Sequence, residues 1–247
     1  MTAFTISLAG FPIRIEALYE STMRFCADYL SSGQPLFHIR METPDLDRER
    51  EQSDRERELE GLPPYRFSGA YLETLAVYRK IAAALLQKDV LLLHGSVMAF
   101  EGKAYLFTAP SGTGKTTHCR LWLSELPGAY VLNGDKPLLR VEPDQVFACG
   151  TPWQGKENYG RNEILPLEAI CILARDSSNH IAPVSFHDAF PVLLAQCNRP
   201  PEAEALLHTL KLAERLGKLT RLYRLGCNME PEAALVSFRA LYGEEPA

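Results

Sequence analysis

The sequence predicts an α/β domain built on a mixed sheet with a phosphate-binding loop, preceded by a small α+β region. The glycine-rich segment Ala109–Thr116 follows the apolar run Ala104–Thr108 and precedes a segment, residues 117–126, whose apolar side chains share one helical face. This order of strand, loop and helix is what a phosphate-binding loop requires. Several short apolar runs with brief turns between them surround the loop and predict antiparallel strands beside it.

The N-terminal region predicts a few strands and a short helix. Two alternating runs, Phe4–Leu8 and Ile13–Ile15, flank a turn at Gly10-Phe-Pro12 and predict paired strands. Apolar residues over 18–30 recur with a weak helical period, and residues 36–39 predict another strand.

A strongly charged segment, Asp45–Glu60, follows these elements. It holds eight acidic residues and four arginines, and only Leu46 and Leu59 are available for burial. We expect a solvated helix with pairs such as Glu51–Arg55, or a mobile loop. A docking role for a basic partner is the alternative.

Proline and glycine interrupt the chain at Gly61-Leu-Pro-Pro64, where we expect the boundary between a region of residues 1–64 and a domain of residues 65–247. One-sided apolar residues predict a helix over 71–86, and a buried strand follows over 90–93. A hairpin of strands 96–100 and 103–108, turning at Glu101-Gly102, leads into the loop. The remaining strands are expected over residues 129–132, 138–141, 145–148, 169–173 and 219–225, and the remaining helices over 202–216 and 232–241.

The loop has the chemistry of a nucleotide site. Gly112 and Gly114 let backbone N–H groups face a phosphate, and the helix behind them adds its positive dipole end. Lys115 would reach the β- and γ-phosphates of ATP, and the Thr116 hydroxyl would ligate Mg²⁺. Ala109 replaces the usual first glycine and fits only with a negative φ. The alternative is an ordinary turn. The predicted nucleotide-binding residues are Ser111, Gly112, Thr113, Gly114, Lys115, Thr116 and Thr117.

Two polar residues at strand ends are candidates for the reaction centre. Asp135 follows the strand 129–132, and phosphoryl transfer needs a carboxylate to hold Mg²⁺ or position the acceptor beside the loop. The alternative for Asp135 is a turn residue after Asn133-Gly134. His94 ends the strand 90–93, where a histidine is either structural or functional.

The segment Gly150–Arg161 is rich in glycine and polar residues, so we do not expect it in the core. Loops of this composition bind anions or substrates. Lys156 and Arg161 would meet a phosphate or a carboxylate, and Trp153 would stack or wall a cleft. We assign Trp153, Lys156, Glu157 and Arg161 to the acceptor substrate, with a surface Ω-loop as the alternative.

Composition argues against several classes of function. The net charge is −5, so the composition does not indicate the basic surface that binds nucleic acid. No apolar run reaches the roughly 18 residues of a membrane span, and the N-terminus lacks the pattern of a signal peptide. The six cysteines are far apart and form no C-x-x-C pair, which predicts reduced thiols in a cytoplasmic protein. We expect neither nucleic acid nor membrane as a partner, and homo-oligomer formation stays open.

Three motifs occur in order: Leu93-His-Gly-Ser96 before the hairpin, Ser-Gly-Thr-Gly-Lys-Thr-Thr over 111–117, and Asn133-Gly-Asp135. Together they resemble the HPr kinase/phosphorylase family and its relatives of phosphoenolpyruvate-carboxykinase-like P-loop fold. The whole chain is similar to a group of short bacterial HPr-kinase-like proteins. Some of these accompany ribosomally made peptides and phosphorylate a serine on them.

The resemblance implies roles for individual residues. It assigns catalysis to Asp135, His94 and Lys115, and Mg²⁺ binding to Thr116 and Asp135. HPr kinases carry an acidic doublet where this chain has Gly134-Asp135, so Asp135 either covers both metal and base duties or supports only weak catalysis. They also carry a glutamate where this chain has Thr117, which argues against phosphorylase activity.

We therefore expect an ATP·Mg²⁺-dependent phosphotransferase, a kinase whose acceptor is a hydroxyl and first of all a serine of a peptide or small protein. A non-catalytic, nucleotide-dependent binding module is the first alternative, and Gly134 and Ala109 favour it. A small-molecule kinase is the second alternative, because the motifs do not identify the acceptor.

Overall fold

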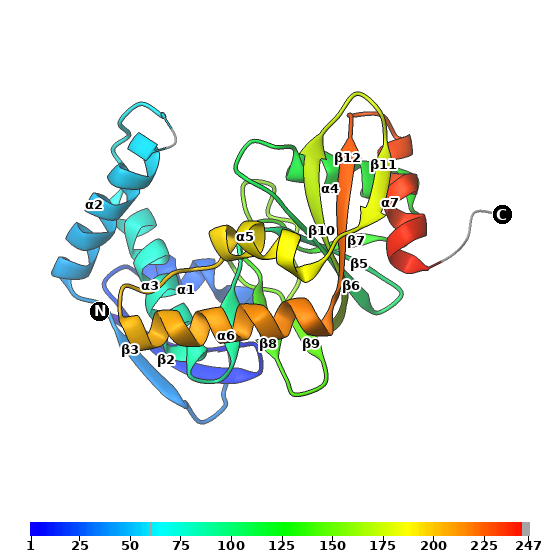
Figure 1. The fold of residues 1–247 in the computed structure, drawn as a ribbon. Coiled ribbons are helices and arrows are strands. Elements are labelled where there is room, and N and C mark those ends of the chain that lie inside the picture. The colour runs from blue at the N-terminus through cyan, green and yellow to red at the C-terminus, as the bar shows by residue number, and fades with distance from the viewer. Residues whose placement is uncertain (60, 244–247) are drawn as a thin grey trace. The chain divides into compact units, whose positions relative to one another are not determined.

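The computed structural model describes residues 1–59 and 61–243, and the chain divides into two compact units, Met1–Leu85 and Leu86–Ala247 (Figure 1). Glu60, the last residue of the predicted charged segment, and residues 244–247 at the end of the predicted second domain lie outside the described residues.

The first unit contains a three-stranded sheet. Its strands lie in the order β1 (Thr2–Leu8), β2 (Phe11–Ala17) and β3 (Phe37–Arg40), with β1 and β2 antiparallel and β2 and β3 parallel. The turn between β1 and β2 uses a positive φ at Ala9 and at Gly10. The helices are α1 (Glu20–Phe25), the 3₁₀ turn η1 (Ala27–Tyr29), α2 (Thr43–Leu59) and α3 (Gly69–Leu86). The strands predicted in this region are confirmed.

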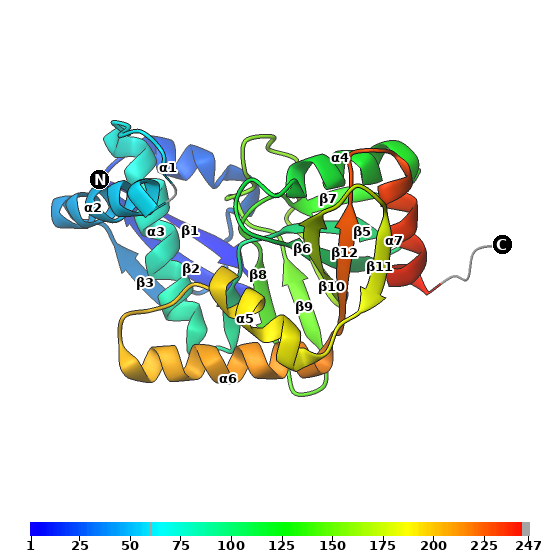
Figure 2. The same ribbon diagram turned by 45° about the horizontal axis from the view of Figure 1, so that its top comes forward.

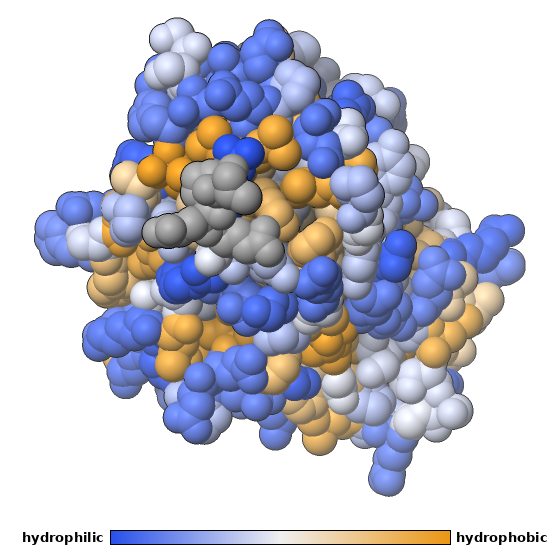
Figure 3. All heavy atoms as spheres, turned by 90° about the vertical axis from the view of Figure 1, so that its right-hand side faces the viewer, coloured by the Kyte–Doolittle hydropathy of each residue, from blue (hydrophilic) through white to orange (hydrophobic). Residues whose placement is uncertain are grey.

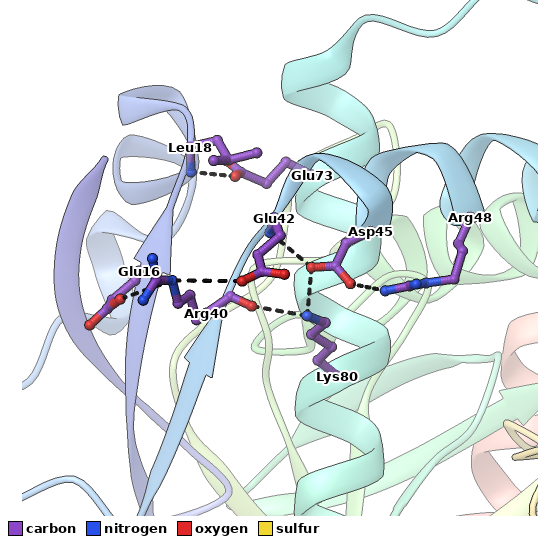
Figure 4. A network of polar contacts seen from close by, with 8 residues as sticks. All are labelled: Glu16, Leu18, Arg40, Glu42, Asp45, Arg48, Glu73 and Lys80. Atoms are coloured by element: carbon purple, nitrogen blue, oxygen red, sulfur yellow. Dashed lines mark hydrogen bonds and ion pairs between the residues drawn. The ribbon is translucent and has the colours of Figure 1, made fainter.

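The charged segment forms α2, but its carboxylates are not all solvated. Asp45 and Glu49 are buried and pair with α3: Lys80 Nζ lies 2.6 Å from Asp45 Oδ2, and Arg79 Nε lies 2.7 Å from Glu49 Oε2. Lys80 also donates to the carbonyl of Arg40, so it joins α2, α3 and β3 (Figure 4). Burial raises the pKa of Asp45, yet the hydrogen bonds from Lys80, Glu42 and Arg48 outweigh burial and lower it overall.

Two further details of the charged segment differ from what the sequence predicts. The predicted Glu51–Arg55 pair is replaced by a bond from Arg55 Nε to the backbone carbonyl of Glu51, 3.3 Å away. Leu59, expected to be buried, is 88% exposed. The face of α2 that packs inward is polar because its partners on α3 are cations.

The boundary between the units follows Leu85, not residue 64 as expected. The cause is α3, whose buried Glu73 accepts hydrogen bonds from the backbone N–H groups of Leu18 and Tyr19 and from the Thr22 hydroxyl. A buried carboxylate needs such donors, so α3 is tied to the N-terminal region.

The second unit contains a curled mixed sheet in the order β4-β8-β9-β10-β6-β5-β7, with β12 beside β10 and β11 beside β12 (Figure 2). β10 begins antiparallel to β9 and continues parallel to β6 and β12. The strands are β4 (Val90–Leu92), β5 (Ser96–Phe100), β6 (Lys103–Thr108), β7 (Tyr130–Asn133), β8 (Leu138–Val141), β9 (Val146–Cys149), β10 (Ile164–Arg175), β11 (His180–Pro183) and β12 (Arg221–Cys227). The helices are α4 (Lys115–Glu125), α5 (Phe186–Gln196), α6 (Ala203–Leu219) and α7 (Glu232–Tyr242).

Two cores lie on opposite faces of this sheet, as the alternation along β6 shows. Tyr105 and Phe107 belong to the core under α4 and α7, where both rings contact the fully buried Trp122. Ala104 and Leu106 belong to the core under α5 and α6. β6 is thus buried on both faces, and the loop that follows it begins at a strand packed between two cores.

On the face shown in Figure 3, hydrophilic residues separate smaller hydrophobic patches. Within residues 1–59 and 61–243, no helix is both long and apolar enough to cross a membrane.

Candidate functional site

The three sequence motifs meet at one edge of the sheet because of how β5, β6 and β7 pair. β5 is antiparallel to both neighbours, and Val97 lies opposite Leu106 of β6 and Asn133 of β7. The start of β5 therefore lies beside the ends of β6 and β7. This pairing brings together His94, Asp135 and the predicted phosphate-binding loop of residues 109–116, hereafter the phosphate loop.

The phosphate loop has a backbone suited to an anion. Gly112 (φ +74°) and Gly114 (φ +125°) adopt conformations that favour glycine, and no heavy atom lies within 4 Å of an added Cβ at either. Ala109 does not have a positive φ, and its methyl group is buried in the core under the loop. The replacement of the usual glycine is therefore accommodated.

Lys115, the first residue of α4, is buried and curls back over the loop. Its Nζ donates to the carbonyl of Ala109 at 2.8 Å and to that of Pro110 at 3.4 Å. The Thr113 hydroxyl donates to the same Pro110 carbonyl. Ser111 and Thr116 are exposed, and Thr117 is partly buried.

His94 and Asp135 form a pair beside this loop. His94 Nε2 lies 3.2 Å from Asp135 Oδ1, and about a third of each side chain is exposed. Burial raises the pKa of Asp135, but the His94 hydrogen bond and the charges of Lys136, His94 and Lys115 outweigh burial and lower it. Asp135 therefore stays ionised, as a metal ligand or a proton acceptor must.

Asn133, which the sequence places in the Asn133-Gly-Asp135 motif without a role of its own, builds the turn that presents Asp135. Its buried Oδ1 accepts from the backbone N–H groups of Asp135 (3.0 Å) and Lys136 (2.8 Å), and its Nδ2 donates to Thr151 Oγ1 at 2.9 Å. Because Asn133 satisfies these amides, the Asp135 carboxylate is available to His94. An asparagine at a strand end, two residues before an aspartate, is the signal that could have identified it.

Gly134 lies in a position where a side chain would clash. An added Cβ at this position would lie 2.4 Å from the backbone carbonyl of Gln154, and the Gly134 carbonyl accepts from Ser96 Oγ at 2.7 Å. No side chain fits here without moving the Gln154 backbone, so Asp135 is the carboxylate that this turn can present.

The first part of the Gly150–Arg161 loop is packed against the Asp135 turn, contrary to the expectation that it lies outside the core. Thr151, Trp153 and Gln154 are all buried. The Trp153 carbonyl accepts from Lys136 N at 3.3 Å, and an added Cβ at Gly155 would lie 3.2 Å from Asp135 Cβ. Trp153 is therefore a support for the site, and its ring is not an exposed surface for stacking.

The second part of the loop is more exposed, and its predicted substrate residues diverge. Lys156 is exposed, while Glu157 pairs with Arg120 of α4 at 2.6 Å. The Arg161 guanidinium lies 3.8 Å from the centre of the Tyr130 ring. Lys156 and Arg161 are thus the exposed residues among the four predicted acceptor residues.

The residues present fit a nucleotide with Mg²⁺. The Thr116 hydroxyl and the Asp135 carboxylate are hard oxygen donors, and Mg²⁺ usually takes a few such ligands together with phosphate oxygens and water. Among the described residues, no group of three or more His, Cys, Asp or Glu side chains is placed to hold a metal by itself.

Comparison with solved structures finds distant similarity. No family model and no curated protein sequence matches this chain. A solved structure of the Hpr(Ser) kinase/phosphatase from Coxiella burnetii is similar with 14% identity and a TM-score of 0.27, over 51% of this chain and 90% of that chain.

Proposed function

We propose that this protein is an ATP·Mg²⁺-dependent kinase that transfers the γ-phosphoryl group to a hydroxyl. The observation that carries the proposal is the pair His94–Asp135 at the same sheet edge as the phosphate loop with Lys115. A phosphate cradle alone is compatible with binding, whereas an ionised carboxylate held beside it supplies what phosphoryl transfer requires.

Each residue then has a defined task. The loop amides and Lys115 would neutralise charge on the β- and γ-phosphates, and Thr116 and Asp135 would hold Mg²⁺. Asp135 accepts the proton of the attacking hydroxyl while the new oxygen–phosphorus bond forms and the bond to the departing ADP breaks. His94 orients the Asp135 carboxylate through the contact at 3.2 Å.

For the acceptor we propose a serine of a peptide or small protein. The resemblance of the three motifs to HPr-kinase-like proteins supports this choice. The Gly150–Arg161 loop supports it further, because Gly155 lies against Asp135 and the exposed Lys156 follows directly. A chain bound along this loop would place a hydroxyl near the carboxylate.

A second candidate function is a nucleotide-dependent binding module without phosphoryl transfer. The specific observation in its favour is Gly134, where the close Gln154 carbonyl leaves no room for a second carboxylate. Under this alternative, nucleotide binding would order the loop for a partner.

The deciding experiment measures binding and transfer separately. Calorimetry with ATP·Mg²⁺ tests the nucleotide site, and incubation of the protein with labelled ATP and a serine-peptide library tests transfer. Label on peptides with the wild type, and none with Asp135→Asn, supports the kinase. Binding without transfer to any hydroxyl supports the binding module, and transfer only to small hydroxyl compounds supports a small-molecule kinase.

A further inference from the structure

Arg175, a residue that no sequence motif singled out, reaches the phosphate loop from the end of β10. Its Nη2 lies 2.5 Å from the carbonyl oxygen of Gly112, and its Nε lies 3.3 Å from that of Thr113. β10 runs parallel to β6 with Ile172 opposite Thr108, so both strands end at the edge where the loop lies. The guanidinium fork thus spans two consecutive carbonyls of the loop.

These two contacts determine which way the loop amides point. In a planar trans peptide the N–H group points opposite to the carbonyl of the preceding residue, and no described peptide bond is cis. With the carbonyls of Gly112 and Thr113 turned toward Arg175, the N–H groups of Thr113 and Gly114 are turned away from it. The Thr113 N–H donates to the Pro110 carbonyl at 3.3 Å, which leaves the Gly114 N–H as the donor whose direction Arg175 sets for a ligand.

A second cation holds the other part of the loop. Lys115 Nζ donates to the carbonyls of Ala109 and Pro110, so two side chains together hold four loop carbonyls. Lys115 must give up part of these contacts when it turns to a phosphate, whereas Arg175 need not move. Thr113 also bonds to the Pro110 carbonyl through its N–H group and its hydroxyl, so Arg175 adds to a turn that holds part of the loop. Gly112 and Gly114 give the rest of the backbone more conformational freedom than other residues would.

We infer that Arg175 is a positioning residue of the nucleotide site, which preorganises the phosphate loop through the carbonyls of Gly112 and Thr113. The inference rests on the proposed function, since it assigns the preorganised loop to ATP·Mg²⁺. A direct charge contact between Arg175 and phosphate is the competing role. The two roles differ in whether hydrogen-bond donors or positive charge must be kept at this position.

Calorimetry with ATP·Mg²⁺ on three variants separates these roles. Arg175→Met removes both charge and donors and should weaken binding by about tenfold, since the loop must then be ordered on binding. Arg175→Gln keeps amide donors without charge and should bind more tightly than Arg175→Met. Arg175→Lys keeps the charge without the fork and should lie between wild type and Arg175→Met. The inference would be overturned in favour of a charge contact if Arg175→Gln bound ATP·Mg²⁺ as weakly as Arg175→Met while Arg175→Lys bound it as tightly as the wild type.

A second measurement needs no nucleotide. Hydrogen exchange of peptides covering residues 109–117 should be faster in Arg175→Met than in the wild type. Arg224→Met is the matched control, because Arg224 is an exposed arginine on the neighbouring strand β12, opposite Ala182 of β11. It removes the same charge and should change neither measurement.

The outcomes distinguish the two levels of the proposal. If the wild type binds no nucleotide, the proposed function fails, while loop exchange still decides whether Arg175 holds the loop. The other case is that the wild type binds ATP·Mg²⁺ while Arg175→Met has the same affinity and the same hydrogen exchange in residues 109–117. In that case the inference on Arg175 is wrong and the proposed function stands.

Discussion

His94 Nε2 lies 3.2 Å from Asp135 Oδ1, although the two residues are separated by a hairpin, the phosphate loop and a helix. A second contact also holds these two segments together: the Gly95 N–H donates to the Asp135 carbonyl at 2.9 Å. Backbone and side chain of Asp135 are thus both held by the segment before β5. The orientation of the carboxylate is a property of the fold and does not wait for substrate.

Asp135→Asn should preserve the fold and most of the nucleotide affinity while lowering turnover by roughly 10²–10⁴-fold, because it removes the charge and keeps the shape. Calorimetry and a phosphotransfer assay on the same preparation check both halves. A variant that transfers phosphate as fast as the wild type would reduce Asp135 to a turn residue.

Lys115→Ala should abolish ATP binding, since no other ammonium in the loop can replace the one that faces the phosphates. The variant also loses the bonds from Nζ to the carbonyls of Ala109 and Pro110, so its unfolding must be checked by circular dichroism. A folded Lys115→Ala that binds ATP·Mg²⁺ with wild-type affinity would contradict the assignment of the nucleotide site.

Gly134→Asp should not restore an acidic doublet but should destabilise the protein, because its Cβ would meet the Gln154 carbonyl. Gly134→Ala is the control for the clash without the charge. Both variants should lose more than about 1 kcal/mol of unfolding free energy in urea titrations. A stable and more active Gly134→Asp would show that the turn can open.

Lys156→Ala should weaken binding of the acceptor and leave ATP affinity almost unchanged, because Lys156 is exposed in the loop that packs on the Asp135 turn. Arg161→Ala should act in the same direction, but it also removes the stacking on Tyr130. KM for acceptor and for ATP, measured for each variant, checks the assignment. Lost ATP binding with intact acceptor binding would instead connect the loop to the nucleotide.

Because His118 is buried, we expect the protein to lose stability in acid. Burial lowers its pKa to about 4, below its usual 6.5, so the unfolded state binds the proton first. The contribution of neutral His118 is present above about pH 6.5 and falls by roughly 2–3 kcal/mol as the pH approaches 4.

Denaturant titrations at several pH values check this prediction, with His118→Gln as the comparison. Ser237 Oγ donates to the Ala234 carbonyl, so it accepts from His118 Nε2 and from Trp122 Nε1. A glutamine keeps a donor for Ser237 but cannot titrate. If the variant and the wild type lose stability equally between pH 7 and pH 4, His118 is not the cause.

The sequence was sufficient for elements with strong local signals. The β5–β6 hairpin has the predicted bounds because Glu101-Gly102 supplies two positive φ values between two continuous, mostly apolar runs. β11 and α5 were missed, because β11 is short and exposed and α5 contains Pro191. Mixed parallel and antiparallel pairing is confirmed in the second unit.

The site was predictable where it follows a motif and less so where it depends on packing. The glycine-rich loop is visible in the sequence, and His94 and Asp135 are visible as polar residues at strand ends. Their closeness to the loop is implied by the resemblance of the three motifs and not by the spacing. The burial of Trp153 is not visible in the sequence, because it depends on how residues 151–154 pack in the folded chain, where the Trp153 backbone bonds to Lys136 of another loop. Nor are the contacts of Arg175, whose partners lie more than sixty residues earlier in the chain.

The pairing of β10 has a consequence for the order in which the chain acquires its site during synthesis. His94, the loop and Asp135 all precede β10, so their residues leave the ribosome before the strand that covers β6 on its other side. Until Leu167–Ile172 arrives, β6 has one edge unpaired, and Arg175 comes last of all. The residues that would hold nucleotide are thus made early, and the strand that makes them rigid is made late.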